Sequence, residues 1–185
     1  VIGAAVALVV GVASIKGWQA YDLNRKSEDS KLLASALKSI ARDTPDTASG
    51  ILAKLAQDGS SGYAELARFN QVAILAKKGD GKAASGAYLA LSDDSSIDEI
   101  MRDMALIMAA LHGIESGDAV ALSQKLTRLI NGTNAWRHSA KELSALLAQK
   151  SGDKAKAQKL YKDLSDDATA PSGIRTRAAE MTAIL

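Results

Sequence analysis

The stretch GDGKAASGAYLALSDD, residues 79–94, recurs as GDKAKAQKLYKDLSDD at residues 152–167. The two copies lie 73 positions apart, and the similarity extends without a gap over 49 aligned positions, 14 of which are identical. A third Gly-Asp pair, Gly117 and Asp118, lies between them and divides the interval into spacings of 38 and 35 residues. Periods of this length are typical of stacked helix-turn-helix repeats. The sequence therefore predicts a repeat protein.

Each Gly-Asp pair predicts the turn between the two helices of a hairpin. Glycine adopts the left-handed backbone conformation that ends many helices, and the aspartate caps the free N–H groups of the next helix. Apolar residues then follow at spacings of four and three, which places them on one helix face. These residues are Ala84, Tyr88 and Leu91 after the first pair, Leu122, Leu126 and Leu129 after the second, and Ala157, Tyr161 and Leu164 after the third.

The rest of the chain is also predicted to be helical, so the expected fold class is all-α. Aromatic residues make up 4% of the chain, proline occurs twice, and no segment has the alternating pattern of a strand. Pro45 and Pro171 suit helix starts, and Ser96 with Glu99 matches a capping box. The expected helices cover residues 1–42, 46–57, 62–78, 81–92, 97–115, 118–131, 134–150, 153–165 and 171–185. Stacked hairpins of this kind form a solenoid with a concave face.

The uncharged run VIGAAVALVVGVASI, residues 1–15, predicts a membrane anchor. As a helix it spans about 22 Å, short of the ~30 Å hydrocarbon core. The sequence does not begin with Met, so we expect a longer apolar segment. Lys16, Trp18 and Tyr21 follow the run, and such residues settle at the membrane edge. A cleaved signal peptide or a buried core helix are the alternatives for this run.

Composition argues against several functional classes. The chain has 23 basic and 21 acidic residues, mixed along its length, with a net charge of +2, and this mixture does not resemble a nucleic-acid-binding protein. The richest basic stretch, residues 141–162, is interpreted as a solvated helix face. The absence of cysteine excludes disulfides, thiolate metal sites and thiol nucleophiles.

Candidate chemical groups are few, and each has a structural interpretation. His112 and His138 are the histidines of the chain, and neither has partners at metal-ligand spacing. His138 belongs to the segment Trp136-Arg137-His138, which is expected either to brace a repeat junction or to meet a partner. Ser35 and Lys38 spell a Ser-x-x-Lys pattern, but on an ordinary amphipathic helix.

Recurring charged residues are interpreted in the same way. The acid pairs Asp93-Asp94 and Asp166-Asp167 occupy equivalent repeat positions just past a helix end, which favours turn formation over acid-base catalysis. Asn131-Gly132-Thr133 spells a glycosylation acceptor but is more simply a helix stop. Arg102 and Arg175 are also equivalent, and they are expected to pair with carboxylates between hairpins or to point into the groove.

No catalytic, cofactor-binding or metal-binding residue is therefore predicted, and the chain is not expected to be an enzyme. Partner-binding residues are not identified by the sequence.

The pattern Gly79, Ala84, Tyr88 and Leu91 resembles the second half of a tetratricopeptide repeat. The first helices lack the usual Trp, Leu and Gly signature, so the units resemble divergent members. This resemblance implies a protein-binding solenoid.

A closer resemblance covers nearly the whole chain. The apolar run ending in Gly17-Trp18, the segments DGSSGYAELARF (58–69) and AWRHSAKEL (135–143), and Pro171 followed by IRTRAAEM (174–181) are similar to the YfgM-like family. Members of that family are ancillary subunits of the bacterial Sec translocon.

The resemblance implies a single-pass bacterial inner-membrane protein with a periplasmic repeat domain that joins the translocon to periplasmic chaperones or clients. The expected division is a transmembrane anchor with an interfacial segment over residues 1–25 and a repeat domain over residues 26–185. The alternative function is a stabilising or assembly subunit of another inner-membrane complex.

Overall fold

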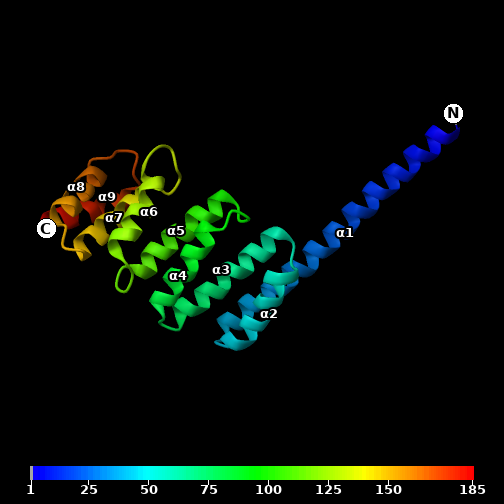
Figure 1. The fold of residues 1–185 in the computed structure, drawn as a ribbon, viewed down its shortest axis with the longest axis horizontal. Coiled ribbons are helices and arrows are strands. Elements are labelled where there is room, and N and C mark those ends of the chain that lie inside the picture. The colour runs from blue at the N-terminus through cyan, green and yellow to red at the C-terminus, as the bar shows by residue number, and fades with distance from the viewer. Residues whose placement is uncertain (1) are drawn as a thin grey trace. The chain divides into compact units, whose positions relative to one another are not determined.

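The fold is that of a computed structural model, which describes residues 2–185 and gives side chains from residue 19 onward. Within that range the chain is all-α, as predicted, and contains no strand. The helices divide between two compact units, Val1–Ile74 and Leu75–Leu185, with α1, α2 and most of α3 in the first (Figure 1). The helices are α1 (Ile2–Ala41), α2 (Pro45–Asp58), α3 (Ser61–Lys77), α4 (Gly81–Asp93), α5 (Glu99–Gly113), α6 (Ala119–Ile130), α7 (Arg137–Lys150), α8 (Lys154–Ser165) and α9 (Ser172–Ile184).

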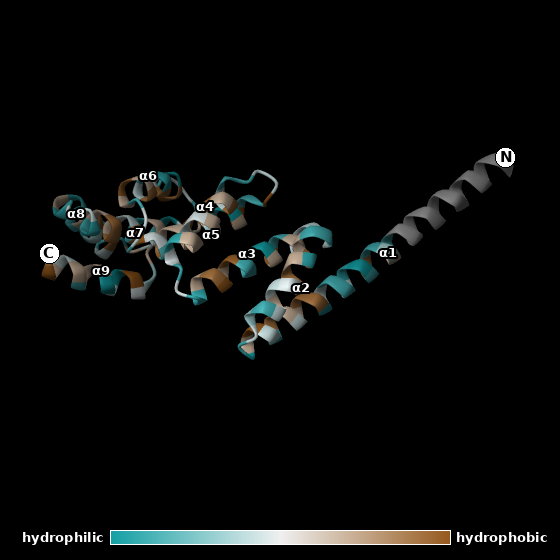
Figure 2. Cartoon of the chain, turned by 60° about the horizontal axis from the view of Figure 1, so that its bottom comes forward, coloured by the Kyte–Doolittle hydropathy of each residue, from teal (hydrophilic) through white to brown (hydrophobic). Residues whose placement is uncertain are grey.

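The predicted membrane anchor over residues 1–25 lies mainly outside the side chains that the structure describes, so it stays a prediction. Among the described residues, no helix combines the length and the apolar character that a membrane span requires. From residue 19 to residue 31, α1 is mostly exposed and largely hydrophilic (Figure 2).

In the first unit, the second half of α1 shares an apolar core with α2 and α3. Ala36 of α1 is fully buried in one cluster with Leu52 and Leu55 of α2 and Ala67 of α3. Fully burying a side chain of leucine size contributes about 1.5–3 kcal/mol. This cluster therefore supplies much of the stability of the unit.

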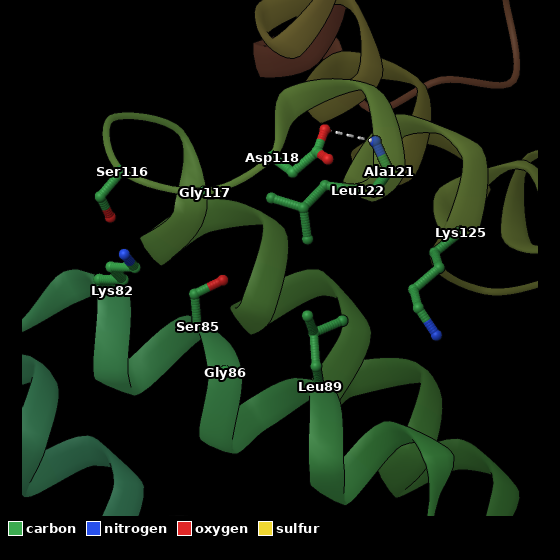
Figure 3. A pocket seen from close by; sticks show the side chains of 10 residues that line it. All are labelled: Lys82, Ser85, Gly86, Leu89, Ser116, Gly117, Asp118, Ala121, Leu122 and Lys125. Atoms are coloured by element: carbon green, nitrogen blue, oxygen red, sulfur yellow. Dashed lines mark hydrogen bonds between the residues drawn. The ribbon is translucent and has the colours of Figure 1, made fainter.

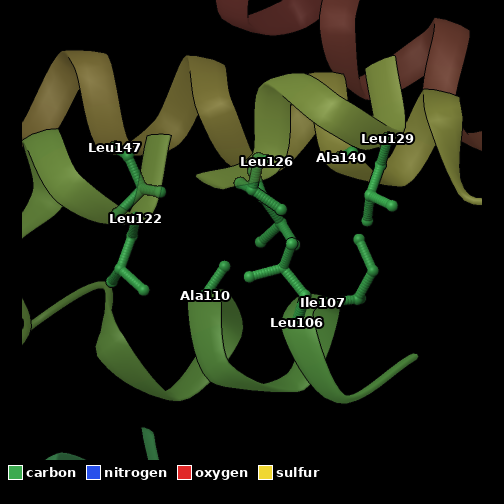
Figure 4. Close-up of a cluster of buried hydrophobic side chains, with 9 residues drawn as sticks. Leu106, Ile107, Ala110, Leu122, Leu126, Leu129, Ala140 and Leu147 are labelled. Carbon is green, nitrogen blue, oxygen red and sulfur yellow. The ribbon is translucent and has the colours of Figure 1, made fainter. Parts of the chain in front are cut away.

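In the second unit, the residues predicted to share one helix face are buried. All nine residues at these positions in α4, α6 and α8 are at most 4% exposed. Figure 4 shows the aliphatic core that α5, α6 and α7 build around the α6 residues, with Leu106 and Ile107 of α5 facing Leu126 and Leu129. A second core joins α7, α8 and α9 around Tyr161. The helical spacing thus predicted the core correctly.

The helices of the second unit form two rows. Consecutive helices from α4 to α9 pack side by side, and α5 also contacts α7, while α7 contacts α9. The odd-numbered helices α5, α7 and α9 therefore form one row, called the inner row here because its helices contact one another, and α4, α6 and α8 form the outer row. In a curved solenoid the row whose helices lie closer together lines the concave face.

The Gly-Asp turns follow the prediction at the two matching copies. Gly79 and Gly152 have φ of 85° and 83°, which is the left-handed conformation that favours glycine. Asp80 accepts a hydrogen bond from the N–H of Ala83 at 2.9 Å, and Asp153 accepts one from Lys156 at 3.0 Å. These caps satisfy donors that the first helical turn leaves free.

The prediction was wrong for the backbone of Gly117, which does not have positive φ. A Cβ on Gly117 would lie 2.7 Å from the carbonyl oxygen of Gly113 and 2.9 Å from Cδ1 of Leu122. Close approach of the turn to α5 and α6 is therefore the reason for glycine here. Asp118 still caps its helix, because it accepts from the N–H of Ala121 at 2.9 Å.

The predicted capping box of Ser96 and Glu99 is also wrong. Asp98 is the N-cap of α5 and accepts from the N–H of Ile100 at 2.9 Å. Ser96 lies before the cap, and its N–H and hydroxyl donate to Asp94. The helix starts two residues later than expected because Asp98 competes for the cap.

We predict that Gly79→Ala and Gly152→Ala each lower the free energy of unfolding by about 1–2 kcal/mol, because alanine is strained at positive φ. Gly50 is the matched control: it lies inside α2, and an added Cβ would meet nothing within 4 Å. Gly50→Ala should raise stability by about 0.5–1 kcal/mol. Urea unfolding followed by circular dichroism measures all three, and equal effects at the three sites would contradict the turn assignment.

A second prediction concerns Tyr161, which is 1% exposed and whose hydroxyl has no hydrogen-bond partner among the described residues. Burial, with a smaller contribution from Glu142, raises the pKa of Tyr161 to about 12. Because the folded pKa exceeds the ordinary value of 10.0, the native state holds the proton more tightly. The stabilisation of the folded state that follows from this raised pKa is complete below about pH 10 and is lost as the pH rises through about 12.

Tyr161→Phe should therefore leave stability unchanged or slightly higher at neutral pH, because it removes a buried unpaired hydroxyl. Between about pH 10 and 12 the variant should lose less stability than the parent chain. Urea midpoints measured across this range test the prediction. A large loss at neutral pH would show that the hydroxyl has a partner.

Candidate functional site

The histidines have structural roles in the described chain. The ring of His112 stacks on that of Tyr88, with centroids 5.7 Å apart and planes at 9°, and so joins α5 to α4. His138 is buried, and its Nε2 lies 3.2 Å from Oδ2 of Asp167 and 3.3 Å from Oγ1 of Thr169. It braces the junction of α7 with the turn between α8 and α9, which is one of the two predicted alternatives.

The other residues of that segment also have contacts within the second unit. Trp136 packs against the core of α5, α6 and α7, and an Nη atom of Arg137 donates to Oγ1 of Thr169 at 3.4 Å. The segment is therefore part of the fold.

The recurring acid pairs form turns, as predicted, and they also form surface ion pairs. Asp94 accepts from the N–H and hydroxyl of Ser96, and Asp167 accepts in the same way from Thr169. Hydrogen bonds from Thr169, with a smaller effect of His138, lower the pKa of Asp167 to about 2. The first acid of each pair lies on the surface, where Asp93 pairs with Lys125 and Asp166 with Lys162.

The remaining predicted motifs also have local roles. Gly132, with φ of 99°, follows the end of α6, as expected for a helix stop. Ser35 and Lys38 are exposed on α1. The basic stretch over residues 141–162 is largely a solvated surface of α8, where Lys159 and Lys162 pair with acids four residues later.

Of the two alternatives for Arg102 and Arg175, ion pairs with carboxylates are absent among the described residues. Both side chains are half-buried, and the Nε of each is buried without an acceptor in the described part of the chain. The alternative, that both side chains point into the groove, stays a prediction.

The structure reveals a recurring contact that the sequence analysis missed. A buried polar side chain on one helix bonds to a residue 31 positions later, in the turn that leads to the next-but-one helix. We name this contact the junction clamp. Among the described side chains it joins Asp29 to Ser60, Asp103 to Asn134, and His138 to Thr169.

The clamp of Asp103 is the most elaborate. Asp103 is 4% exposed and accepts from Nη1 of Arg128 at 2.6 Å and from Nδ2 of Asn134 at 2.7 Å. The Oδ1 of Asn134 in turn accepts from the N–H of Trp136 at 2.8 Å. One carboxylate therefore fixes α5, α6 and the start of α7. Its signal in the sequence was a single acid inside the apolar run of α5, MRDMALIMAAL.

The inner row presents an apolar stripe on α5. Ile100, Met104, Met108 and Leu111 are spaced by four, four and three residues, which places them on one side of the helix. Ile100 is 69% exposed and Leu111 is 49% exposed, while the two methionines are half-buried. Large exposed aliphatic groups at helical spacing are typical of protein-binding surfaces, and methionine adapts to varied partners.

The inner row is polar toward its other end. Arg177 of α9 donates from Nε and an Nη atom to both carboxylate oxygens of Glu142 on α7, at 2.7 and 2.9 Å. This bidentate pair bridges α7 and α9. The odd-helix face, defined here by the α5 stripe and this pair, thus combines an apolar patch with a charged one.

The described residues contain no cluster of three or more His, Asp or Glu side chains able to hold a metal ion. Asp103 and His138 are engaged in junction clamps, and Asp94 and Asp167 in turns.

A family model for a tetratricopeptide repeat-like domain matches residues 1–181 of the chain. No curated protein and no solved structure matches.

We predict that Asp103→Ala lowers the free energy of unfolding by about 2–4 kcal/mol, because it leaves Arg128 and Asn134 without their buried acceptor. Asp93→Ala is the matched control, since Asp93 also pairs with a cation on α6 but its side chain is 62% exposed. The control should change stability by less than about 1 kcal/mol. Denaturant unfolding compares the two, and equal losses would contradict the role of the clamp.

Proposed function

This chain belongs to the tetratricopeptide repeat-like domain family, and from that premise we propose that it is a membrane-tethered scaffold that binds other proteins through its odd-helix face. The observation that carries the proposal is the exposed α5 stripe on the inner row. A helical solenoid presents such a face to peptide or helical segments of partners.

The more specific proposal is an ancillary subunit of the Sec translocon in the bacterial inner membrane. In it, the N-terminal segment anchors the chain, the repeat domain lies in the periplasm, and the partners are the translocon and periplasmic chaperones or clients. The support is the apolar run over residues 1–15 and the resemblance of the quoted segments to the YfgM-like family.

Tethering explains how weak contacts suffice in this mechanism. Holding the repeat domain beside a membrane complex raises its effective concentration near emerging segments, so that individual contacts stay reversible. The methionine-containing stripe suits such contacts, because flexible side chains repack around different apolar partners.

The test places a photo-crosslinking amino acid at Ile100 or at Val120 of the tagged full-length protein in its native membrane. Both positions are exposed, at 69% and 57%, but Val120 lies on α6 of the outer row. We expect translocon subunits or periplasmic chaperones to crosslink from Ile100 much more than from Val120. Ile100→Glu with Leu111→Glu should abolish recovery of these partners, whereas Val120→Glu should not.

Other outcomes decide against the proposal. Equal crosslinking from both positions would show that the odd-helix face is not the specific binding surface. Stoichiometric recovery of a different membrane complex, crosslinked through residues 1–25, would favour the alternative of a stabilising or assembly subunit.

A further inference from the structure

A cavity of about 240 Å³ lies in the outer row of the second unit, between α4, α6 and the turn that precedes α6. Figure 3 shows Leu89 and Leu122 directed into it, with Lys82 and Lys125 on opposite sides. The backbone of Gly86 forms part of its wall on α4. It is separate from the odd-helix face.

The next junction along the repeats, between α6 and α8, shows which side chain can occupy the equivalent space. The Gly-Asp pairs align Ser85 of α4 with Ser123 of α6, and Ala121 of α6 with Lys156 of α8. Between α6 and α8, the Nζ of Lys156 donates to Oγ of Ser123 at 3.1 Å, so the lysine side chain crosses that junction. Between α4 and α6 the aligned residue is Ala121, which is too short to cross. The cavity therefore lies where the next junction has a side chain.

On the α4 side, the wall of the cavity includes a position that has no side chain. Gly86 lies inside the helix, and a Cβ added there would meet nothing within 4 Å. A glycine inside a helix is less stable than alanine, so the fold gains nothing from it at this position. The same alignment places Gln124 at the equivalent position of α6. Ala121 and Gly86 are thus the two small residues that leave space for the cavity between α4 and α6.

Size and charge limit the occupant. Cofactor and drug-sized ligands take cavities of about 300–1,000 Å³, whereas about 150 Å³ already holds a benzene ring. The cavity therefore suits one large apolar side chain, resting on Leu89 and Leu122. Lys82 has no hydrogen bond or ion pair in the part of the chain that the structure describes. Lys125 is bound to the exposed Asp93 alone, a surface pair that exchanges readily.

We propose that this cavity is a second docking site, which accepts a leucine or an aromatic side chain of a partner protein from a segment rich in acidic residues. The apolar side chain fills the space between α4 and α6, and flanking carboxylates pair with Lys82 and Lys125. The proposal rests on the protein-binding function but uses the outer row instead of the inner row.

The test fills the cavity with a lysine side chain, which is what fills the equivalent space between α6 and α8. Ala121→Lys introduces a side chain able to reach Ser85, as Lys156 reaches Ser123. Ala155→Lys is the matched control, because Ala155 is an exposed alanine on α8, one residue before Lys156 and outside the cavity. Both variants add one charge to an outer-row helix. Circular dichroism and thermal unfolding confirm that each variant is folded.

The probe is the peptide acetyl-Glu-Glu-Leu-Glu-Glu-amide, titrated into the isotope-labelled full chain and followed by NMR. We expect saturable shifts confined to residues 82–89 and 116–125. The parent chain and Ala155→Lys should bind equally, and Ala121→Lys should bind about tenfold more weakly, as expected when an anchor side chain is excluded. Replacing the central leucine by alanine, or the glutamates by lysines, should weaken binding as strongly.

Three results would overturn the proposal: no saturable shift at the cavity, equal binding by Ala121→Lys, or equal binding of the lysine peptide. These results are distinguishable from failure of the scaffold function. A chain that still crosslinks partners from Ile100 but fails the peptide titration retains the scaffold function and loses the cavity site.

Discussion

The junction clamp is the contact on which the geometry of the stack depends. Apolar cores hold neighbouring helices together, but hydrophobic burial is not directional and tolerates sliding. A buried carboxylate with two fixed donors is costly to leave unpaired, so it admits few arrangements. Asp103 therefore fixes the angle at which α7 follows α6. Asp29 and His138 occupy the same place in their own repeats, with different chemistry at the same 31-residue distance.

Repeat proteins acquire sites where one repeat departs from the others. The junction of α4 with α6 keeps the buried serine of the next junction but has Ala121 and Gly86 in place of longer side chains. The α5 stripe is a second departure, since the residue of α7 aligned with Met104 is Ser139, and that of α9 is Arg177. Conserving the core and the caps while changing surface side chains leaves the fold intact and alters what each face binds.

The same comparison explains the polarity of α9. The α5 residues Leu106, Ile107 and Ala110 are buried against α6. Their equivalents in α9, which are 73 positions later, are Ala179, Glu180 and Ala183, and all three are exposed. Small and charged residues at these positions make the face compatible with water, as in the capping elements of other solenoids. α9 thus packs on α7 and α8 through one face, while its other face is suited to contact with water.

The sequence by itself determined the all-α class, the hairpin turns at Gly79 and Gly152 and the buried faces of α4, α6 and α8, because caps and helical periodicity are local properties. It also identified the acid pairs as turn formers. The close approach at Gly117, the cap by Asp98, the clamps, the odd-helix face and the cavity were decided by tertiary structure. The clamps join residues 31 positions apart, and the cavity and the odd-helix face depend on how separate helices pack. The cap by Asp98 depends on competition between neighbouring residues, and the close approach at Gly117 depends on how the turn lies against α5 and α6. None of these features is encoded in the spacing of one helix.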